Sequence, residues 1–410
     1  MTVMKKIIDN SFTRLLLAGM MLVAAMFVSC NNDEDSGAGP VITEVRNYAA
    51  APNDTLVNEL VPGQWVVLKG SHLKDAVKIA FNGIAVDFNG GLFADNYAVV
   101  KVPAVIPFPS VAENDLNTIE LVTPKGKVIF DIDIVAGPPV LDHISNENPQ
   151  PGEEVIVYGA NLFQISGLVF AGVSVQEFTG SDDGTAVSFK MPDGAVSGPL
   201  KITTGSGEIL TAFNVNDKTT GVISNADDIS NWEYWGGAQI VSGESNSIFP
   251  GGNVTNFFVM DFASVSGGDG QPWSHAVRIG QTQWIPAESL SDPVDNWAFK
   301  FEINVPNPWL GGSIMVATST GNYLARYEPW QGSPTGFKTT GWQTVTIPFT
   351  QFRDGGSGKG DILKNITDLI GAEGKSNCQI YLHNYEASGI AFKAAFDNIR
   401  VVKIINEQIN

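Results

Sequence analysis

The sequence predicts an all-β protein built from three consecutive β-sandwiches. Gly and Pro are plentiful, with 43 and 22 among the 410 residues, whereas charged residues make up only 16%. Short stretches in which apolar and polar residues alternate, as in half-buried strands, recur along the chain. The first half also repeats itself at a shift of 89 residues, which brings Pro62-Gly63 onto Pro151-Gly152. Repeats of this length made of short strands indicate β-sandwiches.

Composition excludes nucleic-acid binding and wholesale disorder. Asp and Glu outnumber Lys and Arg by 43 to 24, so the formal net charge is −19. A chain this acidic lacks the cations that hold a phosphate backbone, so nucleic acid is not an expected partner. A hydrophobic content of 43% is far above that of a disordered chain.

The first residues of the chain form a processing segment. Basic residues precede a short apolar run from Leu15 to Val28, which ends at Ser29-Cys30. This pattern resembles a bacterial lipoprotein signal, which implies a lipid on Cys30 as the first residue of the mature chain. The polar residues 31–37 resemble the export tag that sends Bacteroidetes lipoproteins to the outer face of the cell outer membrane. The alternative is an ordinary secretory signal with a chance cysteine.

The chain holds only two cysteines, Cys30 and Cys378. If Cys30 carries a lipid, no disulfide can form. Cys378 lies among alternating apolar residues, so we expect it to be buried in a strand.

Each repeat reads as a Pro-Gly turn, a strand, a Gly-x-x-Leu turn and a strand that ends in Phe-x-Gly. The matching pairs include Gly70 with Gly159, Leu73 with Leu162, and Phe81 with Phe170. These motifs resemble the IPT/TIG immunoglobulin-like domain. Neither copy has a cluster of catalytic residue types, so we expect the two to form a stiff spacer that holds the last domain away from the membrane.

Proline pairs and polar stretches divide the chain into five expected parts. They are a lipoprotein signal peptide at 1–29, a flexible acidic linker at 30–39, a first IPT/TIG domain at 40–136, a second at 137–216, and a larger β-sandwich or jelly roll at 217–410. The last part contains eight of the nine tryptophans. Its strand-like segments are 257–262, 298–305, 313–318, 343–349, 379–383 and 394–402, and one helix-like stretch spans 361–370.

Four of these tryptophans lie near proline in Gly- and Pro-rich connections: Trp273, Trp284, Trp309 and Trp330. Loops run over the surface, where a large apolar ring is costly unless it meets a ligand. Proline restricts the chain and so orients the ring before binding. The alternative is that a loop folds back over the end of the sandwich, and we expect one or two of the four to be buried in this way.

The other four tryptophans of the last domain are interpreted as structural. Trp297 continues an apolar alternation along one strand face, and Trp342 opens a strand. Trp232 and Trp235 leave both roles open, with a structural role favoured.

Indole rings stack well on the C–H face of a pyranose, because they offer a large apolar area at a low cost in entropy. Nearby polar residues, Arg278 among them, are suited to hydrogen bonds with uncharged hydroxyl groups. The residues expected to bind glycan are Trp273, Trp284, Trp309, Trp330, Tyr327, Gln283 and Arg326.

The lipoprotein signal, the tandem IPT/TIG repeats and the Trp-rich terminal sandwich together resemble the surface glycan-binding proteins, B type, of Bacteroidetes polysaccharide-utilisation loci. Segments such as Trp297-Ala-Phe-Lys-Phe-Glu and Phe396-Asp-Asn-Ile-Arg-Val are similar to the xyloglucan-binding-type terminal domain of that family. The resemblance implies a carbohydrate-binding-module-like sandwich without catalysis or cofactor. It implies capture of a neutral polysaccharide, a β-glucan or a hemicellulose such as xyloglucan, beside an outer-membrane glycan import complex.

The residues alone do not exclude two other functions. A surface endo-glycosidase needs two carboxylates across the scissile bond, and no spacing among the acids singles out such a pair. An adhesin would instead bind a protein through the repeats. A structural Ca²⁺ held by Asp397 with Asp227 or Asp228 is a further candidate, and the alternative is that these acids are solvated on the surface.

Overall fold

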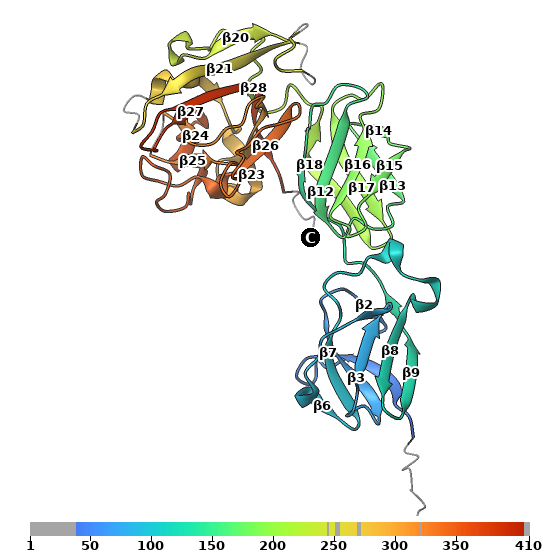
Figure 1. The fold of residues 1–410 in the computed structure, drawn as a ribbon. Coiled ribbons are helices and arrows are strands. Elements are labelled where there is room, and N and C mark those ends of the chain that lie inside the picture. The colour runs from blue at the N-terminus through green and yellow to red at the C-terminus, as the bar shows by residue number, and fades with distance from the viewer. Residues whose placement is uncertain (1–37, 244–245, 251–254, 269–271, 320–321, 406–410) are drawn as a thin grey trace, which may run out of the picture. The chain divides into compact units, whose positions relative to one another are not determined.

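The computed structural model describes residues 38–243, 246–250, 255–268, 272–319 and 322–405. These residues form an almost purely β structure with one short α-helix, α2 (Ile366–Ile370), which confirms the all-β prediction. They divide into two compact units, which are described separately (Figure 1). The first unit holds the residues up to Ile106 together with Val111–Val135, and the second holds Pro107–Ser110 and the chain from Ala136 onward.

The expected signal peptide and the lipidation site at Cys30 lie outside the described residues. Within the part of the chain that is described, no helix has the length and apolar character needed to span a membrane.

The first unit is a β-sandwich with two main sheets. One sheet has the order β1 (Val41–Asn47), β3 (Trp65–Ser71), β7 (Tyr97–Lys101) and β6 (Phe93–Ala94). The other has the order β5 (Ile84–Ala85), β4 (Lys78–Phe81), β8 (Thr118–Thr123) and β9 (Gly126–Asp131), and a short parallel pair joins β2 (Glu59–Leu60) to β10 (Asp133–Ile134). Alternate residues such as Val66, Leu68 and Phe81 are fully buried, as the apolar alternation predicted.

The second unit begins with a sandwich of the same plan. One sheet has the order β11 (Val140–Ile144), β12 (Glu154–Ala160), β16 (Ala186–Lys190) and β15 (Phe178–Gly180), and the other has β14 (Val173–Ser174), β13 (Gly167–Phe170), β17 (Gly198–Thr204) and β18 (Gly207–Val215). Glu154 faces Lys190 across β12 and β16, just as Trp65 faces Lys101 across β3 and β7. The sequence repeat is therefore a structural repeat with the same strand register.

The rest of the second unit is a larger sandwich. Its six-stranded sheet has the order β20 (Gln239–Ser242), β21 (Asn256–Val265), β28 (Ile390–Lys403), β23 (Trp297–Asn304) and β26 (Gln343–Pro348), with β19 (Val222–Ser224) also paired to β28. Its four-stranded sheet has the order β22 (Ala276–Gln283), β27 (Lys375–His383), β24 (Ser313–Thr318) and β25 (Leu324–Tyr327). Phenylalanine and aliphatic side chains of both sheets fill the space between them, and Cys378 of β27 is among these buried residues, as expected.

The helix expected over 361–370 is only half formed. The backbone of Leu363 donates to the carbonyl of Phe352, and Ile362 forms a bridge with Arg353. Because these residues pair as an extended strand would, the helix begins only at Ile366.

The second sandwich covers one face of the six-stranded sheet. Glu147, which follows β11, lies 2.5 Å from Lys300 of β23 and also pairs with Arg400 of β28. All three side chains are almost fully buried. The Arg400 guanidinium also donates to the carbonyl groups of Asn214 (3.2 Å) and Asp217 (3.1 Å). Each charge therefore has a partner inside the interface, where an unpaired charge would be costly.

Two further carboxyl groups lie in the same covered face. Glu302 of β23 is the register partner of Asp397 of β28, and it accepts hydrogen bonds from Asn148 (2.5 Å) and Asn398 (2.7 Å). Burial raises the pKa of Glu302. Burial and the neighbouring Glu302 charge raise the pKa of Asp397 well above its usual value. Burial also lowers the pKa of Lys300 to about 8.

Candidate functional site

The outer face of the four-stranded sheet carries long polar and aromatic side chains. Every second residue of these strands packs into the core, so the residues between them point outward. Arg278 of β22 lies opposite Gln379 of β27, and Tyr381 of β27 lies opposite Met315 of β24. Met315 in turn lies opposite Arg326 of β25. The two arginines thus stand on the two edge strands, with Gln379 and Tyr381 between them.

Residues 232–237 extend this sheet beyond β22 and bring the rings of Tyr234 and Trp235 to it. They pair with β22 through the bridges Trp232↔Ile279 and Gly237↔Ala276. Gly236 allows the close approach, because a Cβ there would lie 2.5 Å from the Ala276 carbonyl oxygen. The Trp235 ring lies 3.6 Å from the Arg278 guanidinium and is 51% exposed. Tyr234 beside it is among the most exposed aromatic residues described.

Two more aromatic residues flank the outer face at the far end of β27. Tyr385 stacks on His383 at 3.8 Å between ring centroids, and the Arg326 guanidinium lies 4.8 Å from the same Tyr385 ring. Trp273, in the 3₁₀ turn η5 (Pro272–Ser274), is 49% exposed. This turn packs against β27 and against η4 (Tyr234–Gly236).

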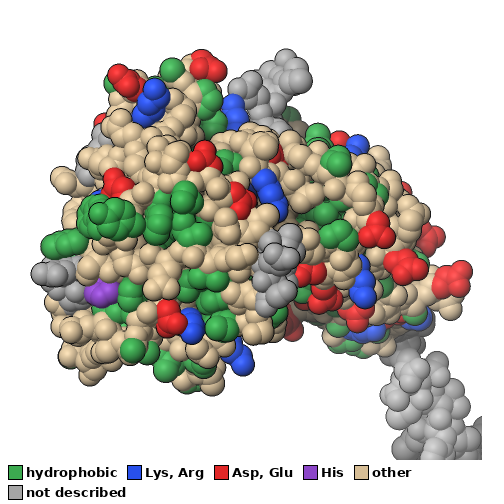
Figure 2. All heavy atoms as spheres, turned by 90° about the horizontal axis from the view of Figure 1, so that it is seen from above, with side chains coloured by type: hydrophobic (Ala, Val, Ile, Leu, Met, Phe, Trp, Pro, Cys, Tyr) green, Lys and Arg blue, Asp and Glu red, His purple; other side chains and the backbone are tan. Residues whose placement is uncertain are grey.

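We call this surface the aromatic face. It comprises Trp235, Tyr381 and Tyr385 on the outer side of the four-stranded sheet, together with Tyr234 of η4 and Trp273 of η5 beside them. In the space-filling view, hydrophobic side chains gather in groups on the molecule, with single acidic and basic side chains around them (Figure 2).

The charges of the aromatic face are compensated within it. Arg278 pairs with Glu233 at 3.1 Å. Arg326 pairs with Glu328 and donates to the Ser357 carbonyl at 2.9 Å. The Nε atom of Arg326 is buried and has no hydrogen-bond partner among the described residues. The two arginines of the face are therefore each paired with an acid beside its aromatic rings.

The phenol groups of Tyr381 and Tyr385 stay neutral at physiological pH. Burial, with a small further effect from Tyr385, raises the pKa of Tyr381 to about 12. Burial raises the pKa of Tyr385 as well. Neutral phenols, an amide at Gln379 and compensated arginines suit hydroxyl-rich, uncharged ligands better than ions.

Two of the seven residues predicted to bind glycan lie at the aromatic face, Trp273 and Arg326. Trp284 and Trp309 do not, because each is only 1% exposed. Trp284 packs on Phe299 at 5.3 Å between centroids, and the Trp309 indole donates to the Gly311 carbonyl at 2.6 Å. Both loops fold back over the core, so the expectation of an exposed ring is wrong for these two and the expectation that one or two would be buried is confirmed.

The remaining three predicted residues are also engaged elsewhere. Trp330 is half-buried, and its indole donates to the Gly312 carbonyl at 2.8 Å. Tyr327 follows Arg326 and so points to the opposite side of β25, where it packs against Phe301 and Trp309. Burial raises the pKa of Tyr327.

Gln283 supports a turn. Its amide donates to the backbone carbonyls of Ile285 (2.6 Å), Glu373 (3.0 Å) and Gly374 (3.1 Å). These contacts fix the connection that leads into β27, away from the aromatic residues.

Sequence reasoning missed Trp235, for which it favoured a structural role. Trp232 packs against Phe258, as that interpretation implied, but Trp235 points outward. The signal was present in the two glycines that follow, Gly236 and Gly237, because they let the segment lie flat against a strand edge. Trp297 and Trp342 are buried, as expected.

The described residues do not form the calcium site that was predicted at Asp397 with Asp227 or Asp228. Asp397 is fully buried and faces Glu302, so it is not a solvated surface acid. Asp227 accepts a hydrogen bond from the Asn256 backbone amide. Among the residues described, no three or more His, Cys, Asp or Glu side chains form a group that could hold a metal ion.

An open, aromatic, charge-compensated sheet face on a β-sandwich is suited to binding an uncharged, hydroxyl-rich ligand. Residues 215–403 match the family described as the surface glycan-binding protein B xyloglucan binding domain. The C-terminal sandwich is therefore similar to that domain.

Two relatives extend this likeness. The crystal structure of surface glycan-binding protein PbSGBP-B from Prevotella bryantii has a TM-score of 0.64 at 19% identity, covering 89% of this chain and 99% of that one. An IPT/TIG domain-containing protein of Bacteroides ovatus is 28% identical over 167 residues, or 40% of this chain. The match spans 34% of that relative's length. The likeness to the first relative concerns the fold alone, over the 89% of this chain that it covers.

Proposed function

We propose that this protein binds a neutral polysaccharide on the aromatic face of its C-terminal sandwich, without chemical conversion. The observation that supports this most directly is the Trp235 ring, held open to solvent by its contact with Arg278. A ring fixed in this way loses little entropy when a sugar stacks on it. The match to a xyloglucan binding domain favours xyloglucan or a related β-glucan as the ligand.

The compensated charges support a binding role over catalysis. Glu233 and Glu328, two acids beside the aromatic face, are each paired with an arginine. A glycosidase needs one carboxyl group that is protonated and one that is free to attack or to activate water. We include in the proposal a lipid anchor at Cys30, an outward-facing position on the outer membrane and transfer of glycan to an import complex.

Affinity electrophoresis and calorimetry on the full chain, with xyloglucan and mixed-linkage β-glucan polymers as probes, test this proposal. We expect retardation on at least one polymer, and much weaker retardation in Trp235→Ala. The matched control is Ile248→Ala, an exposed apolar residue beside Phe249, which packs on Phe257 of the six-stranded sheet. A folded protein that binds neither polymer, or release of reducing ends from a bound one, would overturn the proposal.

A further inference from the structure

The first sandwich carries its own pair of exposed aromatic rings. Trp65, the first residue of β3, is 46% exposed, and Tyr48, just after β1, is 57% exposed. Their ring centroids lie 6.0 Å apart with an interplanar angle of 43°. The backbone amide of Tyr48 donates to the Trp65 carbonyl, which keeps the two residues side by side.

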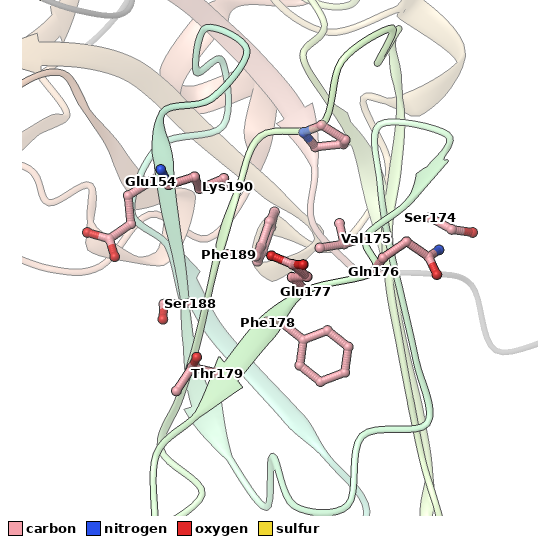
Figure 3. Close-up of a pocket in the computed structure, with 11 residues that line it drawn as sticks. Glu154, Ser174, Val175, Gln176, Glu177, Phe178, Thr179, Ser188, Phe189 and Lys190 are labelled. Carbon is pink, nitrogen blue, oxygen red and sulfur yellow. The ribbon is translucent and has the colours of Figure 1, made fainter.

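The second sandwich shows that this fold does not require an aromatic residue at the Trp65 position. Trp65 faces Lys101 in the first sandwich, and the residue in the same register of the second is Glu154, which faces Lys190. Glu154 and Lys190 lie on neighbouring strands beside an open groove of about 680 Å³ (Figure 3). A charged side chain thus suits the position, so packing does not account for the exposed indole of the first sandwich.

Neutral amide groups border the two rings. The Gln64 amide donates to the Asn47 side-chain oxygen at 3.1 Å, and the Asn47 amide donates to the Thr55 hydroxyl at 2.9 Å. The Gln64 carbonyl accepts from the Val61 backbone amide at 3.2 Å. The site therefore combines rings with a fixed edge of uncharged polar groups, as the aromatic face does.

We infer that Tyr48 and Trp65 form a second contact site for the same neutral polysaccharide; the inference rests on the proposed function. Two rings suit a stretch of two or three sugar units, whereas a stable protein interface needs about 800 Å² on each partner. A second site on the same chain raises the avidity for a long polymer that can occupy both sites, because the second binding event becomes intramolecular. A short oligosaccharide gains nothing from it.

The test compares polymer with oligosaccharide binding in the full chain. We expect the double variant Trp65→Glu, Tyr48→Ala to weaken binding of the polymer about tenfold or more. Glutamate is chosen because Glu154 occupies the matching position of the second sandwich. Affinity of the aromatic face for a heptasaccharide of the same glycan should be unchanged. The matched control is Leu210→Ala, an exposed apolar residue of the second sandwich.

A second measurement follows the fluorine NMR signal of the Trp65 ring. In protein labelled with 5-fluorotryptophan and carrying Trp235→Ala, the fluorine signal of Trp65 should still shift with the heptasaccharide. Polymer affinity that is unchanged in the Trp65→Glu, Tyr48→Ala protein but reduced in Trp235→Ala would overturn this inference. The proposed function would then still stand. A protein partner for the two rings would give that result. No glycan binding by the unmodified chain would overturn both.

Discussion

The two sheets of the C-terminal sandwich present outer faces that differ in chemistry and in cover. The outer face of the six-stranded sheet carries Lys300, Glu302 and Arg400, and all three are buried under the second sandwich. The outer face of the four-stranded sheet carries aromatic rings, among them Trp235, and is left open. The charged side chains of the covered face find their partners within the protein, whereas the rings of the open face remain accessible to solvent.

The largest effect should come from breaking the buried charge cluster. Glu147→Gln leaves Lys300 and Arg400 without their counter-charge, so we expect the free energy of unfolding of the second unit to fall by about 3–5 kcal/mol. Denaturant unfolding measures this. The control is Glu120→Gln, which breaks an exposed pair with Lys78 (2.7 Å) and should cost at most about 1 kcal/mol. Equal losses in the two variants would contradict the difference between the covered face and the surface.

The tryptophans divide into buried rings and exposed rings, and we expect only the exposed ones to contact the ligand. Trp284→Ala removes a fully buried ring and should lower the free energy of unfolding by about 3–5 kcal/mol. Trp235→Ala should instead weaken polysaccharide binding by about 2 kcal/mol, roughly 30-fold, with a nearly unchanged melting temperature. Calorimetry and thermal unfolding separate the two. A large stability loss in Trp235→Ala would place that ring in the core.

The covered face should also respond to pH. Because the folded-state pKa of Asp397 is raised, the unfolded chain releases this proton first as pH rises. The contribution of Asp397 to stability is therefore present below its unfolded pKa and lost as pH rises toward the folded pKa. Asp397→Asn should remove this loss, so its stability relative to the unmodified protein should increase from pH 4 to pH 7. A constant difference across that range would contradict the assigned direction.

Binding at the aromatic face should respond little to pH or salt. Burial raises the pKa of Tyr385 and raises that of Tyr381 to about 12, and the two arginines of the face are paired with acids. Between pH 6 and pH 9, and between low and high salt, we expect affinity for a neutral glycan to change less than about twofold. A steep salt dependence, measured by calorimetry, would indicate an anionic ligand.

Local patterns predicted the fold and part of the site. Alternation and the repeat depend on neighbouring residues, so the sandwiches, the strand at Cys378 and the buried Trp297 followed from the sequence. Trp284 and Trp309 are buried by rings such as Phe299 and Phe392, which are brought near only by the folded sheets. Proline beside a tryptophan orients the ring but does not determine whether it faces the solvent or the core.

Local sequence patterns also could not predict that the second sandwich covers the six-stranded sheet. Lys300 and Glu302 alternate with Phe299 and Phe301, as outward polar residues of any half-buried strand would. Their burial depends on Glu147, which lies more than a hundred residues earlier in the chain. A sequence read in short windows contains no sign of such a pair.

The most direct test of the aromatic face is a fluorine NMR titration of the full chain labelled with 5-fluorotryptophan. A heptasaccharide of the polymer that the protein retains serves as the ligand, and single Trp→Phe variants assign the signals. We expect shifts for Trp235 and Trp273 and unchanged signals for Trp284 and Trp309. Shifts of Trp284 and Trp309 without those of Trp235 and Trp273 would contradict it.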